Sequence, residues 1–176
     1  MAKSELTLLA EFYLIKKAMR NCERYGLEVG IGNGRVDFVT SKLNYRNMRL
    51  PEITCYEIKV SISDFNSENG HNLVGDYNYY VVSEEVFEYM KTDKKVKYKF
   101  FTEDGKISDN GDEGLIVIKN SGLRVIREAK KDYFCKLTIE NKITVMDNIL
   151  LSWTSGSMFK YLTRHGIILR NDERVD

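Results

Sequence analysis

Apolar and polar positions follow a helical period at the start of the chain. Residues 4 to about 25 repeat their apolar side chains every three to four positions, which predicts an amphipathic helix with Ser4 as its N-cap. Gly26 is suited to a helix C-terminus, so the helix is expected to end close to it. Glycines at 26, 30, 32 and 34 then predict a flexible stretch before the first strand.

Most of the remaining elements are expected to be strands. Residues 35–39 alternate in polarity, 53–60 are rich in β-branched and aromatic side chains, and 78–82 form a third run of this kind. Two further short strands, 114–118 and 123–126, are joined by Lys-Asn-Ser-Gly and predict a hairpin.

Two more helices are expected in the second half of the chain. Residues 83–91 begin with Ser83 and two glutamates, the composition of a helix N-terminus. The segment from about 144 to 164 is expected to form one or two helices. The polar stretch 101–113 is expected to be a surface loop or an extra hairpin. This order of elements predicts one α/β domain, with a central mixed β-sheet flanked by helices.

Composition limits the classes of protein to which this sequence can belong. The 176 residues include 27 basic and 26 acidic side chains, so the net charge of +1 does not demand a polyanionic partner. The three cysteines form no C-x-x-C pair, which predicts reduced thiols and a cytoplasmic location. The apolar stretch 6–15 is interrupted by Glu11, is too short to cross a bilayer, and lacks a signal-peptide cleavage site. No membrane association is therefore expected.

The strand 53–60 carries the strongest chemical signal. Side chains alternate across a strand, so Glu57 and Lys59 project to the same side. Two charges on such an apolar strand are costly unless they are paired or used. Asp37 lies about twenty residues upstream, on a strand expected to pair with this one through the 41–52 loop, and would then reach Glu57. The alternative is an incidental ion pair on an exposed edge strand.

This trio suits a divalent cation. Mg²⁺ or Mn²⁺ takes hard oxygen ligands, which Asp37, Glu57 and the backbone carbonyl of Ile58 could supply. A bound ion lowers the pKa of a water molecule and offsets charge on a phosphate, and Lys59 would orient that water or stabilise the transition state. The trio therefore predicts metal-assisted phosphodiester hydrolysis.

Four segments, 35–39, 56–65, 75–82 and 114–118, resemble in order and spacing the MmcB-type branch of the PD-(D/E)XK nuclease superfamily, which includes bacterial DNA-repair-related and phage-encoded proteins. The resemblance covers residues 4–130 and implies a restriction-endonuclease-like core. It also implies that Asp37 and Glu57 are the metal carboxylates, Lys59 the motif lysine and Glu11 an additional active-site glutamate. Asp37 departs from the common pattern because no proline precedes it. We expect a nuclease-like domain at 1–130, with 131–176 as a helical extension packed on it.

Several side chains have both a functional and a structural interpretation. The candidate nucleic-acid contacts are Arg35, Lys42, Arg46, Arg49 and Tyr77; the alternatives are solvated charges and aromatic packing. Asp64 would either hold Lys59 or cap the next helix, and His71 would act as a proton relay or face solvent.

Three hypotheses about function follow. The first is a Mg²⁺-dependent DNA nuclease from a bacterial or phage context. The second is a nuclease-fold binding module, for example a phage protein acting on a host defence complex. The third is an interaction domain in which the E-x-K triplet is incidental. Oligomeric state is left open.

Overall fold

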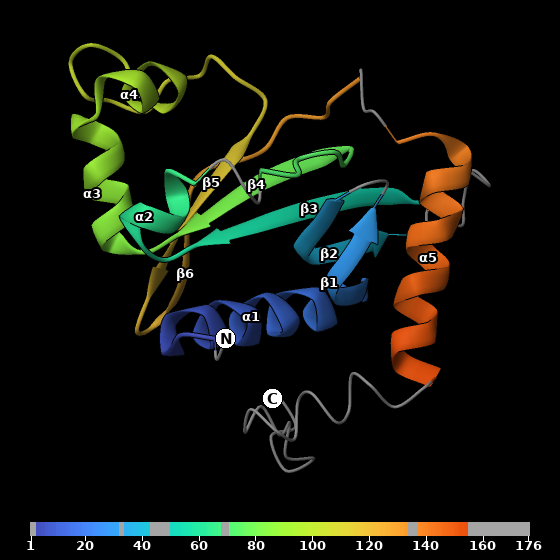
Figure 1. Cartoon of the computed structure of the whole chain (residues 1–176). Helices are drawn as coiled ribbons and strands as arrows, with labels where there is room; N and C mark the ends of the chain where they lie inside the picture. The colour runs from blue at the N-terminus through green and yellow to red at the C-terminus, as the bar shows by residue number, and fades with distance from the viewer. Residues whose placement is uncertain (1–2, 32–33, 43–49, 68–70, 134–136, 155–176) are drawn as a thin grey trace.

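The computed structural model describes residues 3–31, 34–42, 50–67, 71–133 and 137–154 (Figure 1). The helices are α1 (Glu5–Arg20), α2 (Ile62–Phe65), α3 (Glu84–Thr92), α4 (Lys94–Phe100) and α5 (Ile139–Thr154). The strands are β1 (Arg24–Ile31), β2 (Gly34–Lys42), β3 (Glu52–Lys59), β4 (Tyr77–Val82), β5 (Gly114–Lys119) and β6 (Gly122–Arg127).

The six strands form one mixed sheet in the order β1-β2-β3-β4-β5-β6. The pairs β1–β2, β2–β3 and β5–β6 are antiparallel, whereas β3–β4 and β4–β5 are parallel. The prediction of an α/β domain with a central mixed sheet and flanking helices is confirmed.

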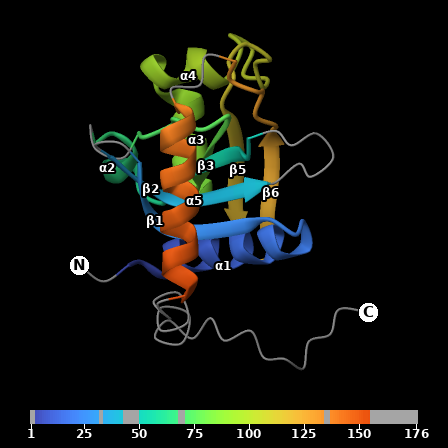
Figure 2. The ribbon, with the colours of Figure 1, turned by 90° about the vertical axis from the view of Figure 1, so that its right-hand side faces the viewer.

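Helices cover both faces of this sheet. Helix α1 packs on one face through a core that includes Leu14, Phe38 and Tyr56. On the other face, α5 covers a second core around Cys55, and the α2–α4 group covers a third core. Figure 2 shows α5 crossing in front of the sheet while α1 runs beneath it. Among the described residues, the structure contains no helix long and apolar enough to span a membrane.

The prediction for the first helix was wrong at its C-terminal end. Ser4 caps α1 as expected, accepting a hydrogen bond from the Thr7 amide, but the helix ends at Arg20 rather than near Gly26. The chain turns at Cys22, which has a left-handed φ of 54°. The stretch predicted to be flexible contains strand β1, whose Val29 and Ile31 are buried.

Gly26 has a packing role rather than a helix-capping one. A Cβ atom at this position would lie 2.7 Å from Val29 Cγ2 and 3.0 Å from Ile149 Cγ1. Because these distances are below normal van der Waals contact, a larger residue would push α5 away from β1. The glycine therefore allows the close approach of the last helix to the first strand.

The other elements lie close to their predicted positions. Ser83 caps α3, and the two strands of the predicted hairpin are β5 and β6. The basic run that follows α3 forms the short helix α4. Residues 101–113 form a loop closed by a single antiparallel bridge between Phe101 and Ile107. Helix α5 begins at Ile139, earlier than expected, and the predicted helix beyond Thr154 lies outside the described residues.

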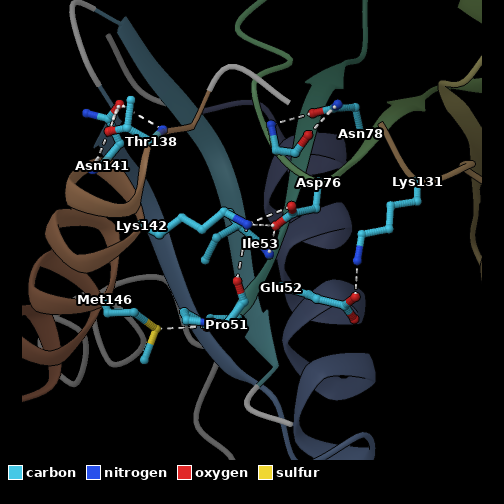
Figure 3. A network of polar contacts seen from close by, with 12 residues as sticks. Pro51, Glu52, Ile53, Asp76, Asn78, Lys131, Thr138, Asn141, Lys142 and Met146 are labelled. Carbon is cyan, nitrogen blue, oxygen red and sulfur yellow. Dashed lines mark hydrogen bonds and ion pairs between the residues drawn. The ribbon is translucent and has the colours of Figure 1, made fainter. Parts of the chain in front are cut away.

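A buried ion pair attaches α5 to the sheet (Figure 3). Lys142 Nζ lies 2.6 Å from both carboxylate oxygens of Asp76, and Asp76 Oδ2 also accepts a 2.8 Å hydrogen bond from the Ile53 amide. At the other end of the helix, Trp153 Nε1 donates to the Tyr25 carbonyl at 3.0 Å. These contacts connect α5 to β1, β3 and the segment before β4.

Candidate metal and active site

The structure brings Asp37 and Glu57 together on neighbouring strands. The β2–β3 pairing runs from Lys42–Glu52 to Phe38–Tyr56, so Asp37 and Glu57 follow directly after its last pair. At this point Asp37 Oδ2 accepts a 2.8 Å hydrogen bond from the Ile58 amide. The Asp37 carboxylate thus contacts the backbone of β3 beyond the last paired residues. The prediction that the two carboxylates lie on adjacent strands of one sheet is confirmed.

Glu57 is fully buried and only half satisfied. Its Oε1 atom accepts a 3.3 Å hydrogen bond from the Asn72 amide, whereas Oε2 is buried without a hydrogen-bond partner in the described part of the chain. Burial, and next the negative charge of Asp37, raise the pKa of Glu57 to about 8, although Lys59 acts in the opposite direction. Glu57 is therefore mostly protonated at neutral pH when no cation is bound.

Asp37 is also shifted toward its neutral form. Burial raises its pKa, and the hydrogen bond from the Ile58 amide acts against this effect. The negative charge of Glu28 adds to the increase. Two neighbouring carboxyl groups that both resist ionisation form a site where an added cation would be stabilised.

Lys59 lies on the same strand face as Glu57, as its spacing predicted. The side chain is buried, and Nζ lies 3.3 Å from Asp64 Oδ1 on α2. The alternative interpretation of Asp64 as a helix cap is wrong, because Ser61 caps α2 and accepts a hydrogen bond from the Asp64 amide. Asp64 instead holds the Lys59 ammonium group. The turn that contains Ser61 therefore helps to orient Lys59.

Two cores on this face of the sheet enclose the site. Register pairs Cys55 with Asn78 and Glu57 with Tyr80, so these side chains share one face. Cys55 belongs to the core beneath α5, and Tyr80 belongs to the core beneath α2–α4. Glu57 lies between these two apolar clusters, which explains the strong burial of its carboxyl group.

A second group of charges lies near the carboxylate pair. Glu11 is fully buried on α1 and forms an ion pair with Lys3, which also lies 2.7 Å from Glu28 Oε1. Burial lowers the pKa of Lys3, but the hydrogen bonds to Glu11 and Glu28 outweigh this effect and raise it. Arg35 Nε contacts Glu28 Oε2 at 2.7 Å. An ion-pair network therefore links Glu11 to Arg35, two residues before Asp37.

The sequence interpretation missed Lys3, Glu28 and Asn72. Glu28 offered a weak sequence signal, because it is an acidic residue inside an apolar run; in the structure it adopts a left-handed φ of 54°. Asn72 donates its amide to Glu57 and its side-chain Nδ2 to the Arg35 carbonyl at 2.9 Å. It thus connects β2 to the buried carboxyl group. No local spacing pattern identifies Lys3 or Asn72.

The candidate nucleic-acid contacts are dispersed. Arg35 is 70% exposed near the carboxylates, but it is paired with Glu28. Lys42 lies five residues from Asp37, about 16 Å along the strand. Tyr77 packs with the core beneath α1, on the face opposite Glu57. The structure thus does not bring Lys42 or Tyr77 to the carboxylate pair. Arg46 and Arg49 lie outside the described residues, and their predicted phosphate contacts stay a prediction.

The Ile58 carbonyl was expected to be a metal ligand. In the structure, the Ile58 amide donates a hydrogen bond to Asp37. The metal-binding role of the Ile58 carbonyl stays a prediction. His71 has both ring nitrogens engaged, Nδ1 with the Tyr80 hydroxyl at 2.9 Å and Nε2 with the Ser67 carbonyl at 3.0 Å. It is therefore held in place although its side chain faces solvent.

The donor set fits a hard divalent cation. Mg²⁺ and Mn²⁺ prefer carboxylate oxygens and keep several water ligands, so two protein carboxylates suffice. Asp37 and Glu57 provide these oxygens, and a cation bound between them would favour the ionised form of both carboxyl groups. Among the described residues, no group of three or more His, Cys, Asp or Glu side chains is arranged as a ready metal cluster.

Comparison with known proteins identifies a fold but no family. No family model matches the sequence, and no curated protein matches it. A solved structure of a protein of unknown function from Silicibacter pomeroyi is similar over 98% of this chain and 100% of its own, with a TM-score of 0.57 and 15% identity. At that identity the likeness supports the α/β arrangement alone.

Proposed function

We propose that this protein is a Mg²⁺-dependent nuclease that hydrolyses phosphodiester bonds of DNA in the cytoplasm of a bacterial or phage-infected cell. The observation that carries the proposal is the buried Glu57 carboxyl group, which lies beside the Asp37 carboxyl group and shares a strand face with Lys59. A carboxyl pair with raised pKa values is typical of a functional site rather than a structural contact.

Each residue of the trio has a distinct role in this proposal. Asp37 and Glu57 would hold Mg²⁺ or Mn²⁺, which when bound would lower the pKa of a water molecule and neutralise phosphate charge. The Lys59 ammonium group, oriented by Asp64, would donate hydrogen bonds to the phosphate as negative charge develops on it. The apolar clusters on either side of Glu57 would exclude bulk water and strengthen these interactions.

The resemblance to the PD-(D/E)XK superfamily supports the same proposal. It implies metal carboxylates at Asp37 and Glu57 and a lysine at position 59, the three residues that form the trio. It also implies an active-site role for Glu11, which here forms an ion pair with Lys3, itself paired with Glu28.

A second candidate is a nuclease-fold binding module with little or no catalysis, for example a phage protein acting on a host defence complex. The ion pairs of Glu11 and Glu28 with Lys3 and Arg35 favour it. Positive side chains in contact with acidic ones already neutralise part of the charge that a catalytic metal would neutralise.

Incubation with single-stranded, nicked and branched DNA, with and without Mn²⁺, tests the enzyme. We expect metal-dependent cleavage of at least one substrate, and its loss in Asp37→Asn and Glu57→Gln. Glu88→Gln is a matched control, because Glu88 is an exposed carboxylate on α3. Absence of cleavage together with absence of metal binding by the wild-type protein would contradict the proposal. Metal binding without cleavage would favour the binding module.

A further inference from the structure

A cavity lies on the opposite side of the sheet from Glu57. It has a volume of about 390 Å³ and is formed by the C-terminal half of α1 and by the β5–β6 hairpin. Its lining includes three basic side chains, Lys16, Lys17 and Arg20, and no acidic one. Such a charge imbalance in a hollow with low-dielectric walls produces a local positive potential.

Helical spacing places the basic residues along one side of α1. Tyr13, Lys16, Lys17 and Arg20 stand at positions i, i+3, i+4 and i+7, which lie on the same face of a helix. This face is distinct from the core-facing side, which includes Leu14. The three basic side chains border the cavity.

The hairpin turn forms the opposite wall. The Tyr13 hydroxyl donates a 2.9 Å hydrogen bond to the Asn120 carbonyl, which connects α1 to the turn. Gly122 adopts a φ of 141°, a conformation that favours glycine, and a Cβ atom there would lie 4.0 Å from Tyr13 Cε1. The tyrosine ring, Leu123 and Val125 supply an apolar surface beside the basic residues.

Aromatic rings, rather than carboxylates, contact the Lys17 ammonium group. Lys17 Nζ lies 5.4 Å from the ring centroid of Tyr79 and 5.8 Å from that of Tyr56. Neither Lys17 nor Arg20 forms an ion pair with an acidic residue in the ranges that the structure describes. Cation–π contacts leave the charge of the ammonium group in place, so it stays available to an anion.

We propose that this pocket binds a nucleotide phosphate. The phosphate oxygens would contact the basic side chains of α1, and the base or sugar would lie on the ring of Tyr13 and on Leu123. The cavity volume lies within the usual range of small-ligand sites, about 300–1,000 Å³. The phosphate can belong to a free nucleotide or to a nucleic-acid strand, because both present the same chemistry. The pocket lies on the face opposite the carboxylate pair, so the inference stands apart from the nuclease proposal.

Binding assays on the full chain in EDTA test this site without any contribution from a metal. The probes are ADP, inorganic phosphate and a short 5′-phosphorylated single-stranded oligonucleotide. We expect wild-type protein to bind ADP or the oligonucleotide. The double variant Lys16→Gln with Arg20→Gln should bind about tenfold more weakly or worse, since one charge-assisted hydrogen bond is worth roughly that factor. The control is Lys94→Gln with Lys95→Gln, which makes the same charge change on exposed positions of α4.

Ser121→Asp provides an independent variant. Ser121 is an exposed residue of the hairpin turn that lines the pocket, so a carboxylate there should repel phosphate with little effect on folding. Tighter binding of ADP than of the oligonucleotide identifies a free-nucleotide site, and the reverse order identifies a strand-binding site. The proposal is overturned if no probe binds at millimolar concentration, or if both pocket variants bind like the control while retaining the wild-type thermal midpoint.

Discussion

Asp37 Oδ2 accepts a 2.8 Å hydrogen bond from the backbone amide of Ile58, the residue between Glu57 and Lys59. This one contact ties the first carboxylate to the strand that carries the other two members of the trio. Asp37 consequently has two roles, one structural and one electrostatic. Substitutions that differ only in charge or only in hydrogen bonding can separate them.

Asp37→Asn retains a side-chain oxygen that can accept from the Ile58 amide, whereas Asp37→Ala leaves that amide without this partner. We expect Asp37→Ala to lower the free energy of unfolding by about 1–2 kcal/mol and Asp37→Asn to lower it less. Both variants should lose Mg²⁺ binding, since a neutral amide is a weaker ligand for a hard cation. Urea titration and calorimetric Mg²⁺ titration measure the two effects. Equal stability of both variants would show that the hydrogen bond contributes little.

The raised pKa of Glu57 predicts a pH-dependent affinity for metal. With a pKa of about 8, Glu57 must lose a proton before its carboxylate can bind Mg²⁺. The apparent affinity should therefore rise about ninefold between pH 6 and 7 and about fivefold between pH 7 and 8, and level off above that range. Titration at several pH values, in buffers of different ionisation enthalpy, measures both the affinity and the released proton. A flat profile between pH 6 and 8 would contradict the assignment.

The same pKa has a consequence for stability. The folded protein holds the Glu57 proton more tightly than an ordinary glutamate with a pKa near 4.5 does. The resulting stabilisation is fully present below about pH 4.5 and is lost as the pH rises through about 8. Glu57→Gln cannot ionise, so its stability should fall less than that of the wild type across this interval. Urea midpoints measured at pH 5, 7 and 8.5 compare the two proteins.

Much of the trio could be predicted because strand geometry is regular. A two-residue period places Glu57 and Lys59 on one face whatever the tertiary context. The connection from β2 to β3 is short enough for an antiparallel pair, which brings Asp37 beside them. Tyr77 shows the limit of this reasoning. Strand alternation places Tyr77 on one face of β4 and Asn78 and Tyr80 on the other. Only the register between β4 and β3 shows that Asn78 and Tyr80, and not Tyr77, share the face of Glu57.

Other parts of the fold carried no usable local signal. Strand β1 contains Gly26 and Gly30, which obscured the alternation of Leu27, Val29 and Ile31. The Cys22 turn has a left-handed φ on a residue with no preference for it, so nothing marked the early helix end. Lys3 contacts Glu11 and Glu28 through tertiary packing, which spacing along the chain does not reveal.

Lys59 should affect turnover much more than metal binding. A lysine ammonium group is not a Mg²⁺ ligand, and in this site it is held by Asp64. We therefore expect Lys59→Ala to retain most Mg²⁺ affinity while cleavage falls by two orders of magnitude or more, the usual cost of losing an electrostatic donor. Parallel metal titrations and cleavage assays on Lys59→Ala and Glu57→Ala test this separation. If Lys59→Ala abolished metal binding as completely as Glu57→Ala, the assigned role would be wrong.

The attachment of α5 provides a last prediction, independent of any catalytic role. Lys142 Nζ lies 2.6 Å from both oxygens of Asp76, and both side chains are almost fully buried (Figure 3). Lys142→Ala would leave a buried carboxylate without its cation, which typically costs about 3–5 kcal/mol. The double variant Asp76→Asn with Lys142→Met removes both charges and retains an oxygen that can accept from the Ile53 amide. We expect it to recover most of the lost stability.

Urea unfolding and amide hydrogen exchange of α5 distinguish the wild type, Lys142→Ala and the double variant. In Lys142→Ala, the amides of α5 should exchange faster than in wild type, while those of β4 and β5 change less, because the ion pair joins α5 to the sheet near Ile53. Lys131 is a useful comparison, since its ion pair with Glu52 is more exposed. Lys131→Ala should cost less than about 1 kcal/mol. Equal losses in Lys131→Ala and Lys142→Ala would mean that burial of the Asp76–Lys142 pair does not determine its contribution.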